Sequence, residues 1–198
     1  MKKNITRDQI VETALELMKD KTDLHGLNLR EIARTLGCAH TNLYNYFSSY
    51  NDLLWETHAS LQEIFMGMLA DKLKTARTTD ERLSCFFEAF VDMYMDNKGW
   101  FRLLWHEHIG GERPERDIEV VETTNEAFKH FLNETWKALT GRYPDKGQTS
   151  RALHNTQCYI AGAVSDYISG RGLIDREDKA KAQISREAVH IFRLCLMA

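Results

Sequence analysis

Apolar residues recur at intervals of three and four positions along most of the chain, which is the spacing of amphipathic α-helices. Alternation of apolar and polar residues, typical of strands, is scarce, and the chain has only two prolines. Thr6 and Thr78 each precede a helical segment and are followed three residues later by Gln9 and Glu81, the spacing of a capping box. The pattern therefore predicts an all-α protein, with helices after the first fifty residues over about 51–74, 78–97, 99–109, 115–139, 148–169 and 175–196.

Residues 28 to 47 carry the most informative local pattern. Asn28 can cap a short helix, with Glu31 at the capping-box position, and Gly37 supplies the permissive backbone that ends this helix. In the next short segment Leu43 and Phe47 stand four residues apart and should face the core, so the polar residues between them point elsewhere. Two short helices that meet at a glycine turn form a helix-turn-helix, and the second helix has the length that fits the DNA major groove.

One set of residues at characteristic spacings runs through the N-terminal segment. It consists of Arg7, Ile10, Ala14, Leu15, Leu29, Ile32, Ala33, Leu36, Gly37, Leu43, Tyr44, Tyr46, Phe47, Asp52, Leu53 and Leu54. Through these residues, positions 6–54 resemble the DNA-binding domain of TetR-family transcriptional regulators, over about a quarter of the chain. The resemblance implies an N-terminal three-helix helix-turn-helix domain over residues 1–50, followed by a helical effector-binding and dimerisation domain over residues 51–198.

The resemblance also implies binding to a palindromic operator in double-stranded DNA. Two positions depart from the family pattern. Ala39 stands where the family usually has a capping Ser or Thr, a role that His40 or Thr41 would then take over, and Tyr50 replaces a phosphate-contacting lysine with an uncharged hydroxyl. Tyr44 has an alternative role, with its ring packed between helices. We predict base or base-proximal contacts from Arg30, His40, Thr41, Asn42 and Tyr46, and phosphate contacts from Asn28, Tyr44 and Tyr50.

The middle of the chain is rich in aromatic residues and methionine. For each such residue alone, an ordinary place in the core is the simpler interpretation. Taken together, flat rings and adaptable methionine side chains favour a cavity for a small-molecule effector, which we expect to be apolar or aromatic. The predicted ligand-binding residues are Phe65, Met68, Phe86, Phe90, Met93, Trp100, Leu104, Trp105, His108, Phe128 and Phe131.

The last two predicted helices carry apolar residues on more than one face, which indicates more than one packing partner. The family resemblance implies a homodimer in which two such helix pairs form a four-helix interface across a two-fold axis. Burial within the same chain is the alternative. The predicted interface residues are Tyr159, Ile160, Ala163, Val164, Tyr167, Ile184, Ala188, Ile191 and Cys195.

No residue pattern indicates catalysis, a cofactor or a metal site. His106 and His108 diverge on a helix, and the chain has neither a phosphate-binding glycine loop nor a nucleophile motif. The net charge of −3 is not that of a strongly basic nucleic-acid-binding protein, although few phosphate contacts per subunit would suffice. Four widely spaced cysteines indicate a reducing compartment, and no secretion signal or membrane span is recognised, so we expect a cytoplasmic protein.

These observations favour a ligand-responsive DNA-binding repressor that a small-molecule effector releases from its operator. One alternative is a helical small-molecule-binding protein or enzyme with an aromatic cavity, which turnover of a substrate would reveal. Another is an activator or a global regulator that binds DNA without responding to an effector.

Overall fold

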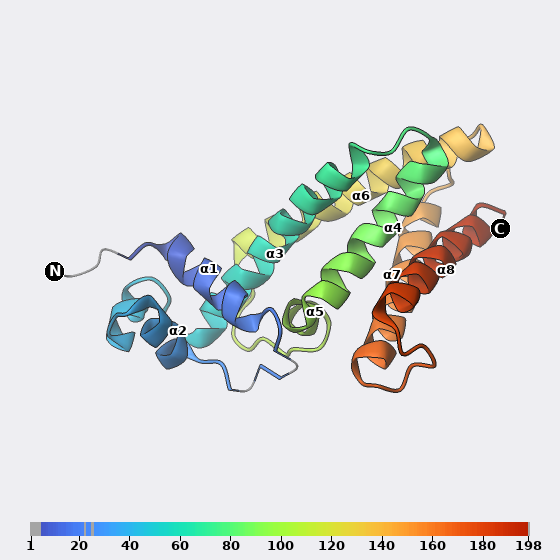
Figure 1. Ribbon diagram of the computed structural model, residues 1–198. Helices are drawn as coiled ribbons and strands as arrows, with labels where there is room; N and C mark the ends of the chain where they lie inside the picture. Colours follow the sequence, from blue (N-terminus) through green and yellow to red (C-terminus); the bar gives the residue numbers. More distant parts are fainter. Residues whose placement is uncertain (1–4, 22, 25, 198) are drawn as a thin grey trace. The chain divides into compact units, whose positions relative to one another are not determined.

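The computed structural model describes residues 5–21, 23–24 and 26–197 (Figure 1). Within these ranges the chain forms helices and connecting loops and no strand, so the predicted all-α class is confirmed. The 3-10 helix η1 stands between α2 and α3. The elements are α1 (Arg7–Met18), α2 (Leu29–Leu36), η1 (His40–Asn45), α3 (Tyr50–Leu73), α4 (Thr79–Asp96), α5 (Lys98–Trp105), α6 (Glu115–Thr140), α7 (Gln148–Ile168) and α8 (Glu177–Met197).

The chain divides into two compact units that each combine separate stretches of sequence. The first unit contains residues 1–63 and 96–121, and the second contains residues 64–95 and 122–198. The helices α3 and α6 each begin in the first unit and continue into the second. The predicted domain boundary at residue 50 falls inside the first unit, which also contains the first half of α3 and all of α5.

The helix starts follow the predicted capping residues. Thr6 forms a reciprocal capping box with Gln9 at the start of α1. The Asn28 side chain accepts hydrogen bonds from the backbone N–H groups of the second and third residues of α2, at 3.0 and 3.2 Å. Gly37 ends α2 with a φ of 71°, a left-handed conformation that glycine adopts without strain. Such caps typically contribute about 1 kcal/mol each, so these residues help to set where the short helices begin and end.

In the first unit, α1, α2 and η1 pack around one small core. Ile10 and Met18 of α1, Ile32 of α2 and Leu43 of η1 are completely buried. Phe47, immediately after η1, is 2% exposed, and the Arg7 guanidinium lies 4.4 Å from the centre of its ring. This core holds η1 against α2, which positions the polar side chains of the helix-turn-helix.

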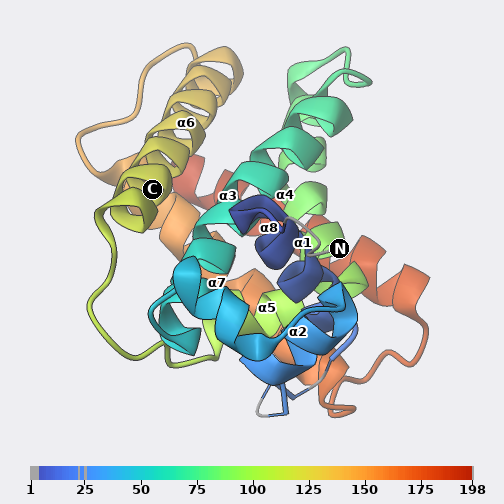
Figure 2. The same ribbon diagram turned by 90° about the vertical axis from the view of Figure 1, so that its left-hand side faces the viewer.

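The start of α5 packs directly against the end of α1, within the first unit (Figure 2). The Gly99 N–H donates to the Lys19 carbonyl oxygen at 3.0 Å, and the Trp100 indole N–H donates to the Leu15 carbonyl oxygen at 2.9 Å. A Cβ at Gly99 would lie only 1.8 Å from the Met18 carbonyl oxygen. The Leu15 carbonyl oxygen also accepts from the Lys19 N–H at 3.1 Å, so Trp100 adds a second donor there, while Gly99 supplies a donor to the carbonyl group of Lys19 just after α1. The short approach to Met18 leaves no room for a side chain at position 99.

A buried carboxylate joins α3 to the start of α6 in the first unit. Asp117 is 1% exposed, and its two oxygens contact His58 Nδ1 at 2.6 Å and Arg113 Nε at 2.5 Å. Burial by itself raises the pKa of Asp117, but the hydrogen bonds and positive charges of His58 and Arg113 outweigh burial and place that pKa below its ordinary value. The carboxylate therefore stays charged near neutral pH.

In the second unit, α7 and α8 pack side by side (Figure 1). Ile160 and Val164 of α7 and Ala188 and Phe192 of α8 are completely buried. The Phe192 ring lies 5.8 Å from Phe87 of α4, between ring centroids, so α8 also packs against α4. Apolar residues on more than one face of α8 are thus used within the chain.

Candidate nucleic-acid interface and ligand sites

The second helix of the helix-turn-helix is a single short 3-10 helix. Its N-cap residue, Ala39, makes no side-chain capping hydrogen bond, and the predicted replacement by His40 or Thr41 is not observed in this part of the chain. The Asn42 N–H donates to the Ala39 carbonyl oxygen at 2.9 Å, and the Tyr46 N–H donates to the Leu43 carbonyl oxygen at 3.0 Å. Six residues without a cap form the tighter 3-10 turn, which is common for short helical segments.

Five of the predicted DNA contacts are exposed on α2 and η1, two elements that pack against each other. His40, Thr41, Asn42 and Tyr44 are exposed on η1, and Arg30 is exposed in the first turn of α2. The Tyr44 side chain is 53% exposed and makes an edge contact with the His40 ring at 6.5 Å between centroids. These five residues are called the reading surface below. Its side chains offer hydrogen-bond donors and acceptors of the kinds that contact base edges and phosphates.

Of the three other predicted DNA contacts, two make hydrogen bonds within the chain and the third has a buried hydroxyl. The Tyr46 hydroxyl donates to the Ile5 carbonyl oxygen, and the Asn28 side chain caps α2 while donating to the Gly26 carbonyl oxygen at 3.3 Å. The Tyr50 hydroxyl is buried and has no hydrogen-bond partner among the described residues, so it does not face a phosphate. Burial, with smaller contributions from Glu107 and Glu31, raises the pKa of Tyr50 far above its ordinary value. We leave these three residues out of the proposed interface.

The structure brings five of the predicted ligand-binding aromatics into one packed cluster in the second unit. The rings of Phe65 and Phe90 lie 4.3 Å apart, those of Phe86 and Phe131 stack at 4.9 Å, and Phe128 lies 5.5 Å from both Phe65 and Phe86. Rings at these distances are in mutual contact, so they fill the space between α3, α4 and α6. We call these five residues the aromatic cluster.

The remaining predicted ligand-binding residues divide between the two units. Met68 is half-buried and Met93 is buried in the second unit, whereas Trp100, Leu104, Trp105 and His108 belong to the first. Trp100 donates to the end of α1, and Trp105 and His108 are exposed. The eleven predicted residues are thus divided between the two units, and their role in ligand binding stays a prediction.

The predicted dimer residues also divide by burial. Ile160, Val164 and Ala188 are completely buried and Ile184 is 5% exposed, so these four residues pack α7 and α8 within the chain. For them the alternative of intramolecular burial holds. The other five keep part of their surface exposed, and three of them line a pocket of about 220 Å³ between the two helices. The half-buried residues are Tyr159, Ala163, Tyr167, Ile191 and Cys195.

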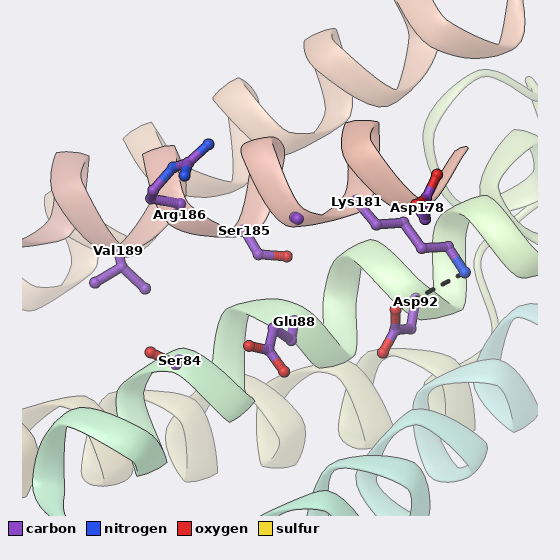
Figure 3. A pocket seen from close by; sticks show the side chains of 9 residues that line it. Ser84, Glu88, Asp92, Asp178, Lys181, Ser185, Arg186 and Val189 are labelled. Atoms are coloured by element: carbon purple, nitrogen blue, oxygen red, sulfur yellow. Dashed lines mark ion pairs between the residues drawn. The ribbon is translucent and has the colours of Figure 1, made fainter. Parts of the chain in front are cut away.

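A polar groove that the sequence did not reveal lies between α4 and α8 in the second unit (Figure 3). Its volume is about 460 Å³. The one sequence signal is a row of polar residues on α4, each one turn from the next, beside the apolar stripe of that helix. The groove is lined by Ser84, Glu88, Asp92, Asp178, Lys181, Ala182, Ser185, Arg186 and Val189.

No group of three or more His, Cys, Asp or Glu side chains in the described residues is arranged to hold a metal ion. None of the helices in the described ranges combines the length and apolar character needed to cross a membrane.

Comparison with known proteins supports the helix-turn-helix. No protein-family model matches the sequence. An HTH-type transcriptional regulator of Haemophilus influenzae is 25% identical over 134 residues, which are 68% of this chain and 63% of that protein. The matched region thus spans less than two thirds of that relative.

Two solved structures share the architecture of nearly the whole chain. The Bacillus subtilis transcriptional regulator FadR, solved in complex with stearoyl-CoA, superimposes with a TM-score of 0.71 at 16% identity, over 94% of this chain and 97% of that one. The TetR-family regulator PfmR of Thermus thermophilus gives a TM-score of 0.61 at 19% identity, over 93% and 97% of the two chains. This chain has the TetR-family fold. The predicted resemblance is therefore confirmed, with the TetR-family helix-turn-helix formed by α2 and η1.

Proposed function

We propose that this protein is a homodimeric transcriptional repressor that binds a palindromic operator and leaves it when a small-molecule effector binds. The observation that carries the proposal is the reading surface, where Arg30, His40, Thr41, Asn42 and Tyr44 are exposed together over a buried core. The sequence relative named as an HTH-type transcriptional regulator and the TetR-family fold support the same function. Neither similarity favours catalysis.

Within this surface, the positions suggest a division of roles. Arg30, His40, Thr41 and Asn42 would contact bases or groups next to them, and Tyr44 would donate its hydroxyl to a phosphate. Residues 1–50 contain seven Lys and Arg against six Asp and Glu, so the DNA-binding unit carries little excess positive charge. Because each neutralised phosphate releases counterions, few ionic contacts imply a shallow dependence of affinity on salt.

The first experiment is a titration of the purified protein against DNA from the region upstream of its own gene and against a scrambled duplex, at several salt concentrations. We expect selective binding with two subunits per site, because two short recognition helices related by symmetry are needed to read enough base pairs. Equal, weak binding to both duplexes would contradict the proposal. An Asn42→Ala variant should bind the operator less selectively, whereas Asn125→Ala, the same change at an exposed position of α6, should bind it as the wild type does.

The dimer would form through the outer faces of α7 and α8. Support comes from the half-buried Tyr159, Ala163, Tyr167, Ile191 and Cys195, and from Leu194, which is 47% exposed on α8. Light scattering of the wild type and of an Ile191→Glu variant tests this assignment. A charge at a buried apolar interface should shift the variant to the monomer, whereas Glu at the exposed position Lys179 should not. A wild-type monomer at micromolar concentration would contradict it.

The effector is proposed to be apolar or aromatic and to enter the aromatic cluster. Its five rings are in contact, so a ligand would have to separate them, and the change in packing would act on both α3 and α4. The solved FadR complex supports stearoyl-CoA as a first probe. We expect this probe to weaken operator binding at least tenfold in the wild type and less in a Phe90→Leu variant. An unchanged affinity with stearoyl-CoA and with a panel of planar aromatic compounds would contradict this site.

A further inference from the structure

The groove between α4 and α8 contains polar groups that are not fully used by the fold. Along α4, Ser84, Glu88 and Asp92 follow one another at intervals of one turn and face the groove, while Lys181 and Ser185 face it from α8 (Figure 3). The rest of its lining from α8 is charged or small and apolar. This arrangement differs from the aromatic cluster, whose rings are packed against one another.

The charges in the groove are unevenly neutralised. Lys72, in the last turn of α3, lies 2.5 Å from Asp92 and 3.2 Å from Glu88, and Lys181 lies 3.9 Å from Asp92. Burial lowers the pKa of Lys72, but the hydrogen bonds and charges of Asp92 and Glu88 outweigh burial and raise it. Asp92 thus has two cationic neighbours. Among the described residues Glu88 pairs with Lys72 alone, which Asp92 also contacts, and 43% of the Glu88 side chain is exposed, which leaves a partly unpaired carboxylate beside the groove.

The hydroxyl of Ser185 is open to the groove. The residue is 7% exposed, no hydrogen bond of its hydroxyl is found among the described residues, and the hydroxyl oxygen is not fully enclosed. Buried hydroxyls elsewhere do find partners: the Thr57 and Thr156 hydroxyls each donate to the carbonyl oxygen four residues earlier, at 2.7 and 2.8 Å. The Ser185 side chain points instead into the space between α4 and α8 (Figure 3). A buried polar group that faces a cavity is suited to a polar ligand.

We propose that this groove is a second ligand site, which binds the ammonium group of a small aliphatic amine. A protonated primary amine has three N–H donors and no acceptor, and the Glu88 carboxylate and the Ser84 and Ser185 hydroxyls supply three acceptors. The methylene chain of the ligand would lie against Val189 and the methyl group of Ala182. The lining also contains the cations Lys181 and Arg186, but Lys181 lies 3.9 Å from Asp92 and the Arg186 guanidinium points away from α4 (Figure 3). The carboxylate of Glu88 therefore favours a cationic over an anionic ligand beside it.

Ligand binding in the groove would change the contacts of Lys72, in the last turn of α3. The ligand ammonium replaces Lys72 as the partner of Glu88, so Lys72 retains only its contact with Asp92. Because α3 begins at Tyr50, shortly after η1, a change at its end offers a route to the DNA-binding unit. This regulatory consequence rests on the proposed function, whereas amine binding does not.

The test is calorimetric titration of the full chain with 1-butylamine and 1,4-diaminobutane, at fixed pH and ionic strength. 1-Butanol and butyrate are the control ligands, since they have the same carbon chain without an ammonium group. We expect saturable binding of the amines only. Binding of 1-butanol as tight as that of 1-butylamine would overturn the proposal, as would the absence of amine binding.

Two variants and their matched controls locate the site. Glu88→Gln removes the charge and Ser185→Ala removes the buried hydroxyl, and each should weaken amine binding at least tenfold. Glu126→Gln, at a residue on α6 that pairs with Lys129, and Ser165→Ala on α7 change the same groups outside the groove and should leave binding unchanged. Ser185→Ala is the smaller change and is the variant expected to keep the fold intact. Wild-type affinity in both groove variants would overturn the site.

Operator binding, measured on the same samples, separates this proposal from the proposed function. If the amine binds as expected to a protein that does not bind DNA, the site stands and the proposed function fails. If the protein binds its operator but no amine, the site fails and the proposed function stands. A shift in operator affinity on adding 1,4-diaminobutane to the wild type, absent in Glu88→Gln, is the result expected if both proposals hold.

Discussion

The reading surface and the aromatic cluster place aromatic side chains in opposite environments. Tyr44 on η1 is 53% exposed, whereas Phe86 on α4 is completely buried and contacts several other rings. η1 has only six residues and is anchored by Leu43, so most of its side chains remain available to a partner. α4 is apolar on a broad face and packs against several helices at once. The same residue class thus stays exposed where the supporting element is short, and packs into the core where the element is surrounded by other helices.

The largest expected effect comes from opening the aromatic cluster. Phe86→Ala removes a ring that contacts Phe87, Phe90, Phe128 and Phe131, and should lower the free energy of unfolding by about 3–5 kcal/mol. Tyr44→Ala, at an exposed ring, should change it by less than about 0.5 kcal/mol. Urea denaturation measures both values. Equal losses for the two variants would remove the contrast between the two regions.

The next effect tests whether α5 belongs structurally with α1. Gly99→Ala places a Cβ 1.8 Å from the Met18 carbonyl oxygen, so α5 must move away, at a cost of about 3 kcal/mol. Gly67→Ala on α3 is the matched control, because nothing lies within 4 Å of its added Cβ, and it should stabilise the protein by up to about 1 kcal/mol. Thermal unfolding compares the two. A neutral Gly99→Ala would show that this contact is dispensable.

A smaller effect, dependent on pH, tests the buried Asp117. Asp117→Asn weakens the contacts to His58 and Arg113 and should cost about 2 kcal/mol at neutral pH. The pKa of Asp117 is lower in the folded than in the unfolded protein, so its stabilisation is present above the ordinary carboxyl pKa of 3.8 and is lost as pH falls below that value.

The free energies of unfolding of the wild type and the Asp117→Asn variant should therefore converge as the solution is acidified. Urea denaturation at pH 7, at pH 4 and at lower pH measures both. Asp71→Asn, at an exposed carboxylate paired with Lys74, should cost less than about 0.5 kcal/mol at each pH. A constant difference between the wild type and Asp117→Asn across this range would contradict the assignment.

The smallest effects concern the reading surface and leave stability unchanged. His40→Ala should reduce discrimination between operator and scrambled DNA by about 1–3 kcal/mol, since a base contact carries sequence information. Tyr44→Phe should weaken binding to both duplexes by a similar factor, because a contact with a phosphate carries no sequence information. Fluorescence anisotropy with the two duplexes measures both. Identical patterns for the two variants would argue against the proposed division of roles.

The sequence predicted local features, such as helix ends, better than it predicted which distant residues lie together. The capping roles of Thr6 and Asn28 and the glycine end of α2 are all observed, and the long helix α3 lies within a residue of its predicted bounds. Each depends on interactions within a few residues of the chain. The form of η1 was not predicted, because a 3-10 turn and a short α-helix show the same apolar spacing over six residues.

Predicted site residues of similar character lie in different environments in the structure. Tyr46 and Tyr50 share the polar, aromatic character of Tyr44, yet the hydroxyl of the first bonds to Ile5 and that of the second is buried. Trp100 lies close in sequence to the aromatic cluster but donates to the end of α1. The groove around Glu88 and Ser185 was missed altogether, since its two walls are about a hundred residues apart in the chain.

The sequence by itself determined the helices, their caps and the helix-turn-helix, because apolar spacing and capping hydrogen bonds act between near neighbours. The tertiary structure decided which helices form each unit, which apolar residues are buried within the chain, and where polar groups meet across a groove. Those outcomes depend on contacts between residues distant in sequence. The periodicity of a sequence does not reveal such contacts. The sequence therefore predicted α5 as a helix, but only the tertiary structure shows that α5 packs against α1.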